Sequence, residues 1–154
     1  MNFPFPLPWL IAALLALLGS WTVDLPTAEQ IHEHRLEQLA ERARPHIKRG
    51  HEERVLQWVE VVERHFDTDR DVVRALCIIS YESGGNENAN RDRSNRNAKG
   101  MWQHLARYWE GRSRNAGVPG ASIWDVEAQT IVAAHLVYNT RGSWQHWVVW
   151  RNCL

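Results

Sequence analysis

Glu82 is the carboxylate in the sequence whose expected surroundings best suit acid–base catalysis. Glu82 follows the apolar run at 76–79 and precedes Gly84-Gly85, a strong helix stop, so it belongs to the last turn of an expected helix. Burial beside that run and the negative end of the helix dipole both disfavour the charged form, and both therefore raise the pKa of Glu82. A carboxyl that stays protonated near neutral pH is suited to donate its proton to a glycosidic oxygen. The alternative is that Glu82 is an ordinary helix-end residue, bonded to an arginine or to water.

Two apolar helices are expected to position Glu82. The segment 69–83 follows a capping sequence at 67–69 and is apolar along most of its length, so we expect it to be the central buried helix. The segment 123–139, with Asp125 as its cap, carries little charge, which predicts a second well-buried helix.

The segments around these helices predict shorter elements. Residues 52–66 carry apolar side chains at helical spacing, and 101–110 suggest a short helix followed by a Gly/Pro loop at 111–121. Residues 86–100 are polar and rich in asparagine, which is typical of a loop. The expected fold class is all-α, with at most a small hairpin in that loop.

The N-terminus predicts an export or membrane segment. Residues 1–23 contain no Lys, Arg, Asp or Glu, and the apolar run is longer than a minimal secretory core but shorter than the about 20 residues of a spanning helix. No basic residue precedes the run and no clean cleavage site follows it, which slightly favours a retained membrane anchor over a cleaved signal peptide. On either interpretation the rest of the chain is extracytoplasmic.

A polar helix is expected between this segment and the catalytic part of the chain. Thr27 with Gln30 gives a capping-box start, and Pro45 stops or kinks the helix. Because most of its positions are polar, we interpret 24–50 as a solvated stalk and 51–154 as the folded domain.

Composition narrows the function classes. Among 154 residues, 18 Lys+Arg balance 18 Asp+Glu, which argues against a dedicated nucleic-acid partner. Within 85–115, however, seven basic residues face three acids, which suits an anionic polymer. The eight histidines lack the spacing of a helical zinc site. We therefore expect no metal and no cofactor.

Three short motifs resemble, in order and spacing, those of lytic transglycosylases and related lysozyme-like domains. Tyr-Glu-Ser-Gly-Gly-Asn at 81–86 resembles the family's Glu-Ser motif, and Gly-Met-Trp-Gln at 100–103 resembles its Gly-Leu-Met-Gln motif. Val-Tyr-Asn-Thr-Arg-Gly at 137–142 resembles its Ala-Tyr-Asn-Ala-Gly motif. The ending, with Trp144, Trp147 and Cys153, resembles that of short actinobacterial and phage members.

The resemblance covers about 65–154 and implies a lysozyme-like fold that binds peptidoglycan glycan strands. It implies that Glu82 is the single catalytic acid/base, that Gln103 lines the glycan cleft, and that Tyr138 orients the catalytic carboxyl. The further substrate-binding residues expected are Ser83, Trp102 and Asn139. The motifs also depart from the family at Met101-Trp102 and Thr140-Arg141. An arginine beside Glu82 would lower its pKa and work against an acid role.

Two reactions at the bond between N-acetylmuramic acid and N-acetylglucosamine remain open. Hydrolysis normally needs a second carboxylate, for which Asp92 is the best candidate and Glu87 and Asp125 are weaker ones. The resemblance favours a lyase reaction instead, in which the C6 hydroxyl of the muramic acid attacks and a 1,6-anhydro sugar forms. A third alternative is a non-catalytic glycan-binding module on the same fold.

The two cysteines and the tryptophans complete the expectations. In an extracytoplasmic domain Cys77 and Cys153 are expected to form a disulfide, with two buried thiols as the alternative. Most of the six tryptophans in 102–150 are expected in the core. Trp102 is the best candidate for a sugar-stacking residue because it lies inside the cleft motif.

Overall fold

Helix α5 (Asp69–Glu82) runs through the core of the fold, as the sequence predicts. The computed structural model describes residues 25–91, 97–141 and 143–153, in two units, 1–32 and 33–154. Thr68 caps α5 because its Oγ1 accepts a hydrogen bond from the Asp71 amide at 3.1 Å. Its buried residues are Val72, Val73, Ala75, Leu76, Cys77, Ile78, Ile79 and Ser80.

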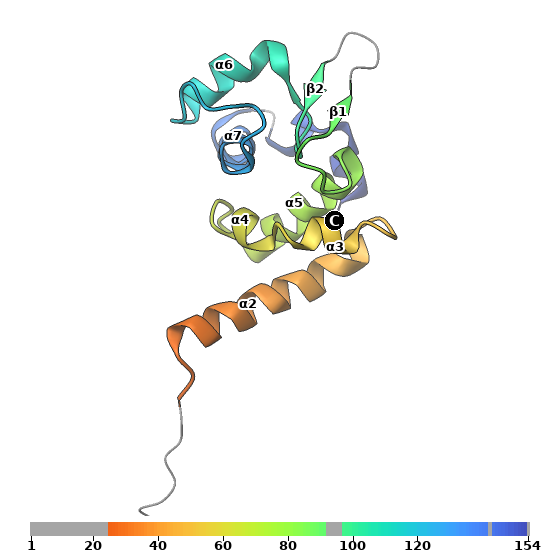
Figure 1. Cartoon of the computed structure of the whole chain (residues 1–154), viewed down its shortest axis with the longest axis vertical. Coiled ribbons are helices and arrows are strands. Elements are labelled where there is room, and N and C mark those ends of the chain that lie inside the picture. The colour runs from red at the N-terminus through yellow and green to blue at the C-terminus, as the bar shows by residue number, and fades with distance from the viewer. Residues whose placement is uncertain (1–24, 92–96, 142, 154) are drawn as a thin grey trace, which may run out of the picture. The chain divides into compact units, whose positions relative to one another are not determined.

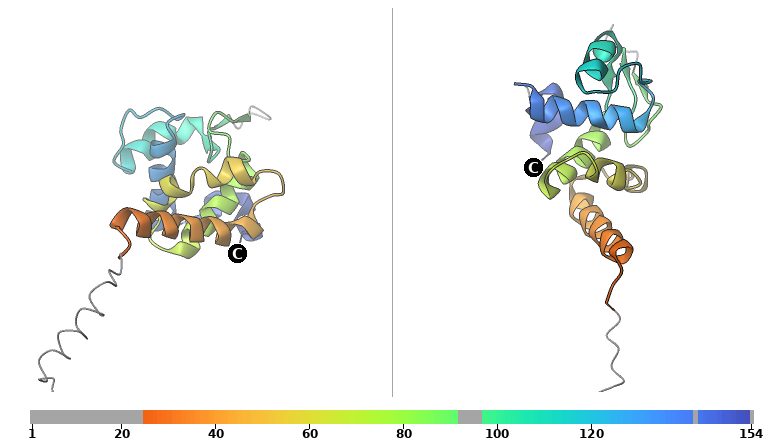
Figure 2. Two further views of the ribbon diagram at one scale, coloured as in Figure 1. Left: turned by 60° about the horizontal axis from the view of Figure 1, so that its bottom comes forward. Right: turned by 90° about the vertical axis from the view of Figure 1, so that its left-hand side faces the viewer.

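Helix α7 (Val126–Asn139) is the second buried helix, and its cap is the predicted one. The carboxylate of Asp125 accepts a hydrogen bond from the Ala128 amide at 3.0 Å. Figures 1 and 2 show α7 between α6 (Ala106–Asn115) on one side and α4 (Val59–Glu63) and α5 on the other. The prediction of a mostly helical fold is therefore confirmed.

The helix expected at 52–66 is interrupted. It consists of α3 (Glu52–Leu56) and α4 (Val59–Glu63), which Gln57 and Trp58 separate. The indole Nε1 of Trp58 donates to the carbonyl of Gly85 at 2.9 Å. This contact links the break to the end of α5, 27 residues away in sequence.

The polar loop contributes two strands to a small antiparallel sheet, and a third strand follows the loop. Strands β1 (Asn90–Arg91), β2 (Ala98–Lys99) and β3 (His104–Leu105) pair in that order, each over two residues. The chain therefore turns at 100–103 and enters α6 only at 106, so the short helix predicted at 101–110 begins later than expected.

Residues 33–50 are part of the folded unit and do not form a solvated stalk. In the second half of α2 (Ala28–Ala43), Leu39 and Ala43 are buried, and Arg42 pairs with Asp69 at 2.5 Å. The 3-10 helix η1 (Arg44–His46) follows, with Pro45 at its start. The domain boundary predicted at residue 51 is thus too late, because sparse apolar residues of the polar helix still reach the core.

The N-terminal unit is described only at 25–32. Within it, the Thr27 amide donates to Gln30 Oε1 at 2.8 Å and the Gln30 amide donates to Thr27 Oγ1 at 3.2 Å, as the capping box predicts. The predicted signal or anchor at 1–23 lies outside the described residues. Among the residues that are described, no helix is long and apolar enough to cross a membrane.

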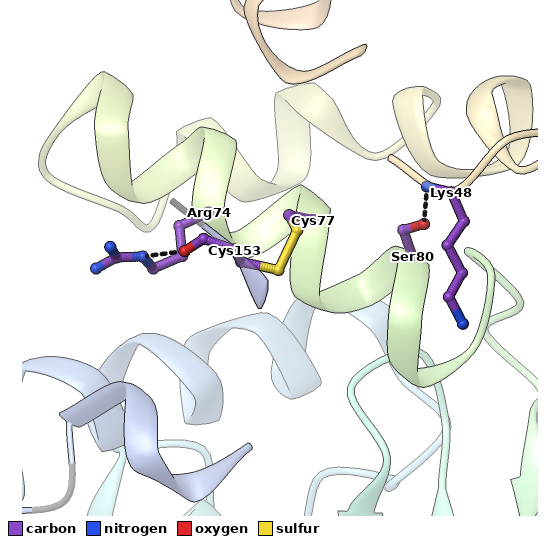
Figure 3. The surroundings of a disulfide bond; sticks show 5 residues. All are labelled: Lys48, Arg74, Cys77, Ser80 and Cys153. Atoms are coloured by element: carbon purple, nitrogen blue, oxygen red, sulfur yellow. Dashed lines mark hydrogen bonds between the residues drawn. A yellow bond between two sulfur atoms is a disulfide. The ribbon is translucent and has the colours of Figure 1, made fainter. Parts of the chain in front are cut away.

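A disulfide ties the C-terminal segment to α5. Cys77 is bonded to Cys153, as predicted, and Arg74 Nε donates to the carbonyl of Cys153 at 3.0 Å (Figure 3). The tail forms two 3-10 helices, η3 (Ser143–His146) and η4 (Val148–Asn152).

Candidate active site

A cleft of about 450 Å³ opens beside the end of α5. It brings together side chains from α5, the small sheet, α6 and the C-terminal tail. Its described lining residues are Glu82, Arg91, Ala98, Gln103, Leu105, Arg107, His146, Trp147 and Val148. Glu82 and Gln103, which the sequence assigns to one site, thus line one cleft.

Glu82 is half-buried in this cleft, and its pKa is raised. The main cause is burial, while the positive charges of Arg91 and Lys48 act in the opposite direction. No described residue forms a hydrogen bond or ion pair with the carboxylate. Arg141, the arginine that the motif places nearby, is exposed and does not line the cleft. The direction of the pKa shift agrees with the expectation, with burial as its leading cause.

Lys48 approaches the same end of α5 from the loop before α3. Its amide donates to Ser80 Oγ at 2.8 Å (Figure 3), and its ammonium lies 4.5 Å from the centre of the Tyr81 ring. This backbone anchor fixes a positive charge near Glu82, where it counters part of the effect of burial.

Gly84 and Gly85 allow a neighbouring segment to pack closely against the end of α5. Both have positive φ, +64° and +80°. A Cβ on Gly85 would lie 2.2 Å from the carbonyl oxygen of Arg54, and one on Gly84 would lie 3.0 Å from the ring of His51. The glycines therefore allow 51–54 to pack directly against the end of α5.

Gln103 is held rigidly with a free acceptor. Its Nε2 donates to the carbonyls of Gly100 at 2.9 Å and Ala89 at 3.2 Å, and the side chain is buried. Its Oε1 has no hydrogen-bond partner among the described residues. A buried acceptor without a partner is costly, so a donor on a bound ligand or water would satisfy it.

Gln129 holds the loop at 100–103 in place. This role was not predicted from the sequence. Gln129 is fully buried in α7, and its Oε1 accepts from the Trp102 amide at 3.2 Å. Its carbonyl oxygen lies 3.0 Å from Nε2 of the buried His104. No signal in the sequence distinguishes Gln129, because α7 carries other polar side chains, among them Thr130 and Asn139.

Trp102 does not line the cleft, which corrects the expectation of a sugar-stacking residue. It is 0% exposed, stacks on Phe66 at 5.8 Å between ring centres, and donates from Nε1 to Thr130 Oγ1 at 3.2 Å. Trp147, whose own Nε1 donates to the carbonyl of Trp102 at 2.9 Å, lines the cleft in its place.

Tyr138 and Asn139 lie away from Glu82. The Tyr138 hydroxyl accepts from the Asp67 amide at 2.9 Å and donates to Asp71 Oδ2 at 3.1 Å, both at the start of α5, whereas Glu82 ends that helix. Burial raises the pKa of Tyr138 to about 12, so the hydroxyl keeps its proton. The expected contact with Glu82 is absent, and the exposed Asn139 does not line the cleft.

The remaining predicted site residues have other roles or lie outside the described part. Ser83 ends α5, where its Oγ donates to the carbonyl of Ile79 at 3.3 Å. Asp125 caps α7, and Asp92 falls outside the described residues. Glu82 is the only carboxylate among the described residues that line the cleft.

His146 is a cleft residue that the sequence analysis did not identify. The pKa of His146 is lowered, mainly by partial burial and secondly by the positive charge of Arg112. Its Nε2 lies 2.7 Å from Thr140 Oγ1. Within the described residues no group of three His, Cys, Asp or Glu side chains is arranged to hold a metal.

The chain matches no protein-family model, no curated protein and no solved structure.

Proposed function

We propose that the chain is an extracytoplasmic enzyme of lysozyme-like fold that cleaves the β-1,4 bond between N-acetylmuramic acid and N-acetylglucosamine in peptidoglycan. The observation that carries this proposal is the environment of Glu82. A half-buried carboxyl with a raised pKa, in an open cleft, is suited to donate a proton to a leaving oxygen.

The charge of the cleft supports an anionic glycan as the substrate. Arg91 and Arg107 line it with Glu82, and Glu82 is neutral when protonated. Peptidoglycan carries carboxylates on its lactyl-linked peptides, which two guanidinium groups would attract. A neutral polymer such as chitin would gain nothing from them.

The lack of a second carboxylate among the described cleft residues favours the lyase reaction over hydrolysis. Glu82 protonates the bridging oxygen, and the C6 hydroxyl of the muramic acid then attacks the anomeric carbon. In the simplest scheme the Glu82 carboxylate takes up the proton of that hydroxyl and so acts as the sole acid/base. The glycan ends in a 1,6-anhydro sugar, and no water is consumed.

The proposal is tested by the release of soluble fragments from purified cell walls by the full-length chain. Glu82→Gln should reduce release at least about 10²-fold while wall binding persists. Glu87→Gln is the matched control, because Glu87 does not line the cleft. Wall binding without release by the wild-type protein would make the chain a glycan-binding module instead.

A further inference from the structure

We infer that His146 is a second catalytic residue of the cleft, the base that takes the proton from the attacking hydroxyl group. This inference rests on the proposed function and changes one step of it. The proton of the C6 hydroxyl goes to the imidazole, whereas the simplest scheme returns it to Glu82.

Thr140 fixes which imidazole nitrogen can act. Its Oγ1 lies 2.6 Å from the carbonyl oxygen of Leu136, which can only accept, so the single hydroxyl proton is donated there. The same Oγ1 lies 2.7 Å from His146 Nε2 and must therefore accept a hydrogen bond from it. The proton of neutral His146 is thus on Nε2, and Nδ1 carries the free lone pair.

Nδ1 is available for chemistry. None of the described residues forms a hydrogen bond with it, and His146 lines the same cleft as Glu82. The arrangement has the form of an activated base: one ring nitrogen is oriented by a fixed hydrogen bond, and the other is left free to accept a proton.

Partial burial in the cleft favours a protonated Glu82 and a neutral His146. With ordinary values of 4.5 and 6.5, the imidazole would hold a proton in preference to the carboxyl. Burial raises the pKa of Glu82 and lowers that of His146, so both changes move the proton toward Glu82. The positive charge of Arg112 on α6 also disfavours the imidazolium.

The step balances without any further reactant. The Glu82 proton goes to the bridging oxygen, which keeps the electron pair of its broken bond to C1 and leaves as the hydroxyl of N-acetylglucosamine. The C6 oxygen forms the new bond to C1, and its proton goes to His146 Nδ1. Glu82 is then a carboxylate and His146 an imidazolium. Water in the open cleft returns the proton from His146 to Glu82.

The test compares His146→Gln with wild type and with His34→Gln, all as full-length chains releasing anhydro-muropeptides. His34 is exposed on α2, which contributes none of the described cleft residues. We expect His146→Gln to lower kcat about 10²-fold and to remove the acidic limb of the pH profile, along which the wild-type rate falls as His146 gains a proton. His34→Gln should keep both.

Two further variants separate catalysis from structure. His146→Ala should regain at least about tenfold of its lost rate in added imidazole, which can act as the base in the vacated space. Thr140→Ser keeps the hydroxyl that orients the ring and should stay near the wild-type rate, whereas Thr140→Val should lose about tenfold.

The outcomes distinguish this inference from the proposed function. If Glu82→Gln is inactive but His146→Gln stays within twofold of wild type with its acidic limb unchanged, the inference is overturned and the proposed function stands. A slow His146→Ala that imidazole does not accelerate also overturns it. If the wild-type chain releases no anhydro-muropeptides, the inference fails together with the proposed function.

Discussion

Gly100 lies against the side-chain amide of Gln129 so closely that no side chain fits between them. A Cβ on Gly100 would stand 2.2 Å from Gln129 Oε1, and the backbone there has φ of +76°. The glycine that begins the motif at 100–103 is therefore required by a buried amide of α7. This contact joins the loop that carries Gln103 to the core of the fold.

Gly100→Ala should lower the free energy of unfolding by about 2–5 kcal/mol, from backbone strain and the clash with Gln129 together. Two matched variants separate these causes in urea unfolding. Gly117→Ala has positive φ but open space, so it should cost about 1 kcal/mol. Gly111→Ala, inside α6 and also in open space, should be neutral or stabilising by up to about 1 kcal/mol. Equal costs at positions 100 and 117 would contradict the role of Gln129.

Removal of the Cys77–Cys153 disulfide should destabilise the protein by about 4 kcal/mol, because the bond closes a long loop in the unfolded chain. Urea unfolding with and without reductant measures this loss. Reductant should have no effect on the double variant Cys77→Ala/Cys153→Ala. Two reactive thiols in the unfolded, unreduced wild-type protein would show that the bond does not form in solution.

Stability should fall in mild acid because of His104. Burial lowers its pKa to about 4, from 6.5, so the unfolded chain binds a proton that the folded protein excludes. The neutral ring therefore contributes stability that is lost as the pH falls from 6.5 toward 4, about 3 kcal/mol in total. His104→Gln should show a flatter dependence of unfolding free energy on pH in this range. An unchanged slope would contradict the burial of a neutral imidazole.

Arg91→Gln should extend activity toward higher pH. The positive charge of Arg91 opposes the effect of burial on Glu82, so its removal raises the pKa of that carboxyl further. Because Glu82 must be protonated to act, the basic limb of the pH–rate profile should move upward. Arg141→Gln is the control, since Arg141 is exposed outside the cleft. A basic limb that stays in place would show that Arg91 does not act on the titrating acid.

The features that the sequence predicted correctly depend on local chemistry. The caps at Thr68 and Asp125 and the buried stripe of α5 follow from neighbours within one or two helical turns. The pKa shift of Glu82 could be predicted for the same reason, because its apolar neighbours precede it directly in the chain.

The features that the sequence did not predict depend on contacts between distant segments. The break at Trp58 accompanies a hydrogen bond to Gly85, and Trp102 is buried because Phe66 and Trp147 pack against it. His146 lies between Trp144 and Trp147, where the resemblance assigns it no role, and only the fold brings it to the cleft with Glu82. The residue types within one segment do not indicate which distant segment it will contact.

The most direct test of the account is the mass of the muropeptides that the full-length chain releases from purified cell walls, with Glu82→Gln alongside. The account predicts products lighter by one water than hydrolysis products, and none from Glu82→Gln. Products with ordinary reducing ends would contradict the lyase reaction. Release that survives Glu82→Gln unchanged would contradict the central role of Glu82.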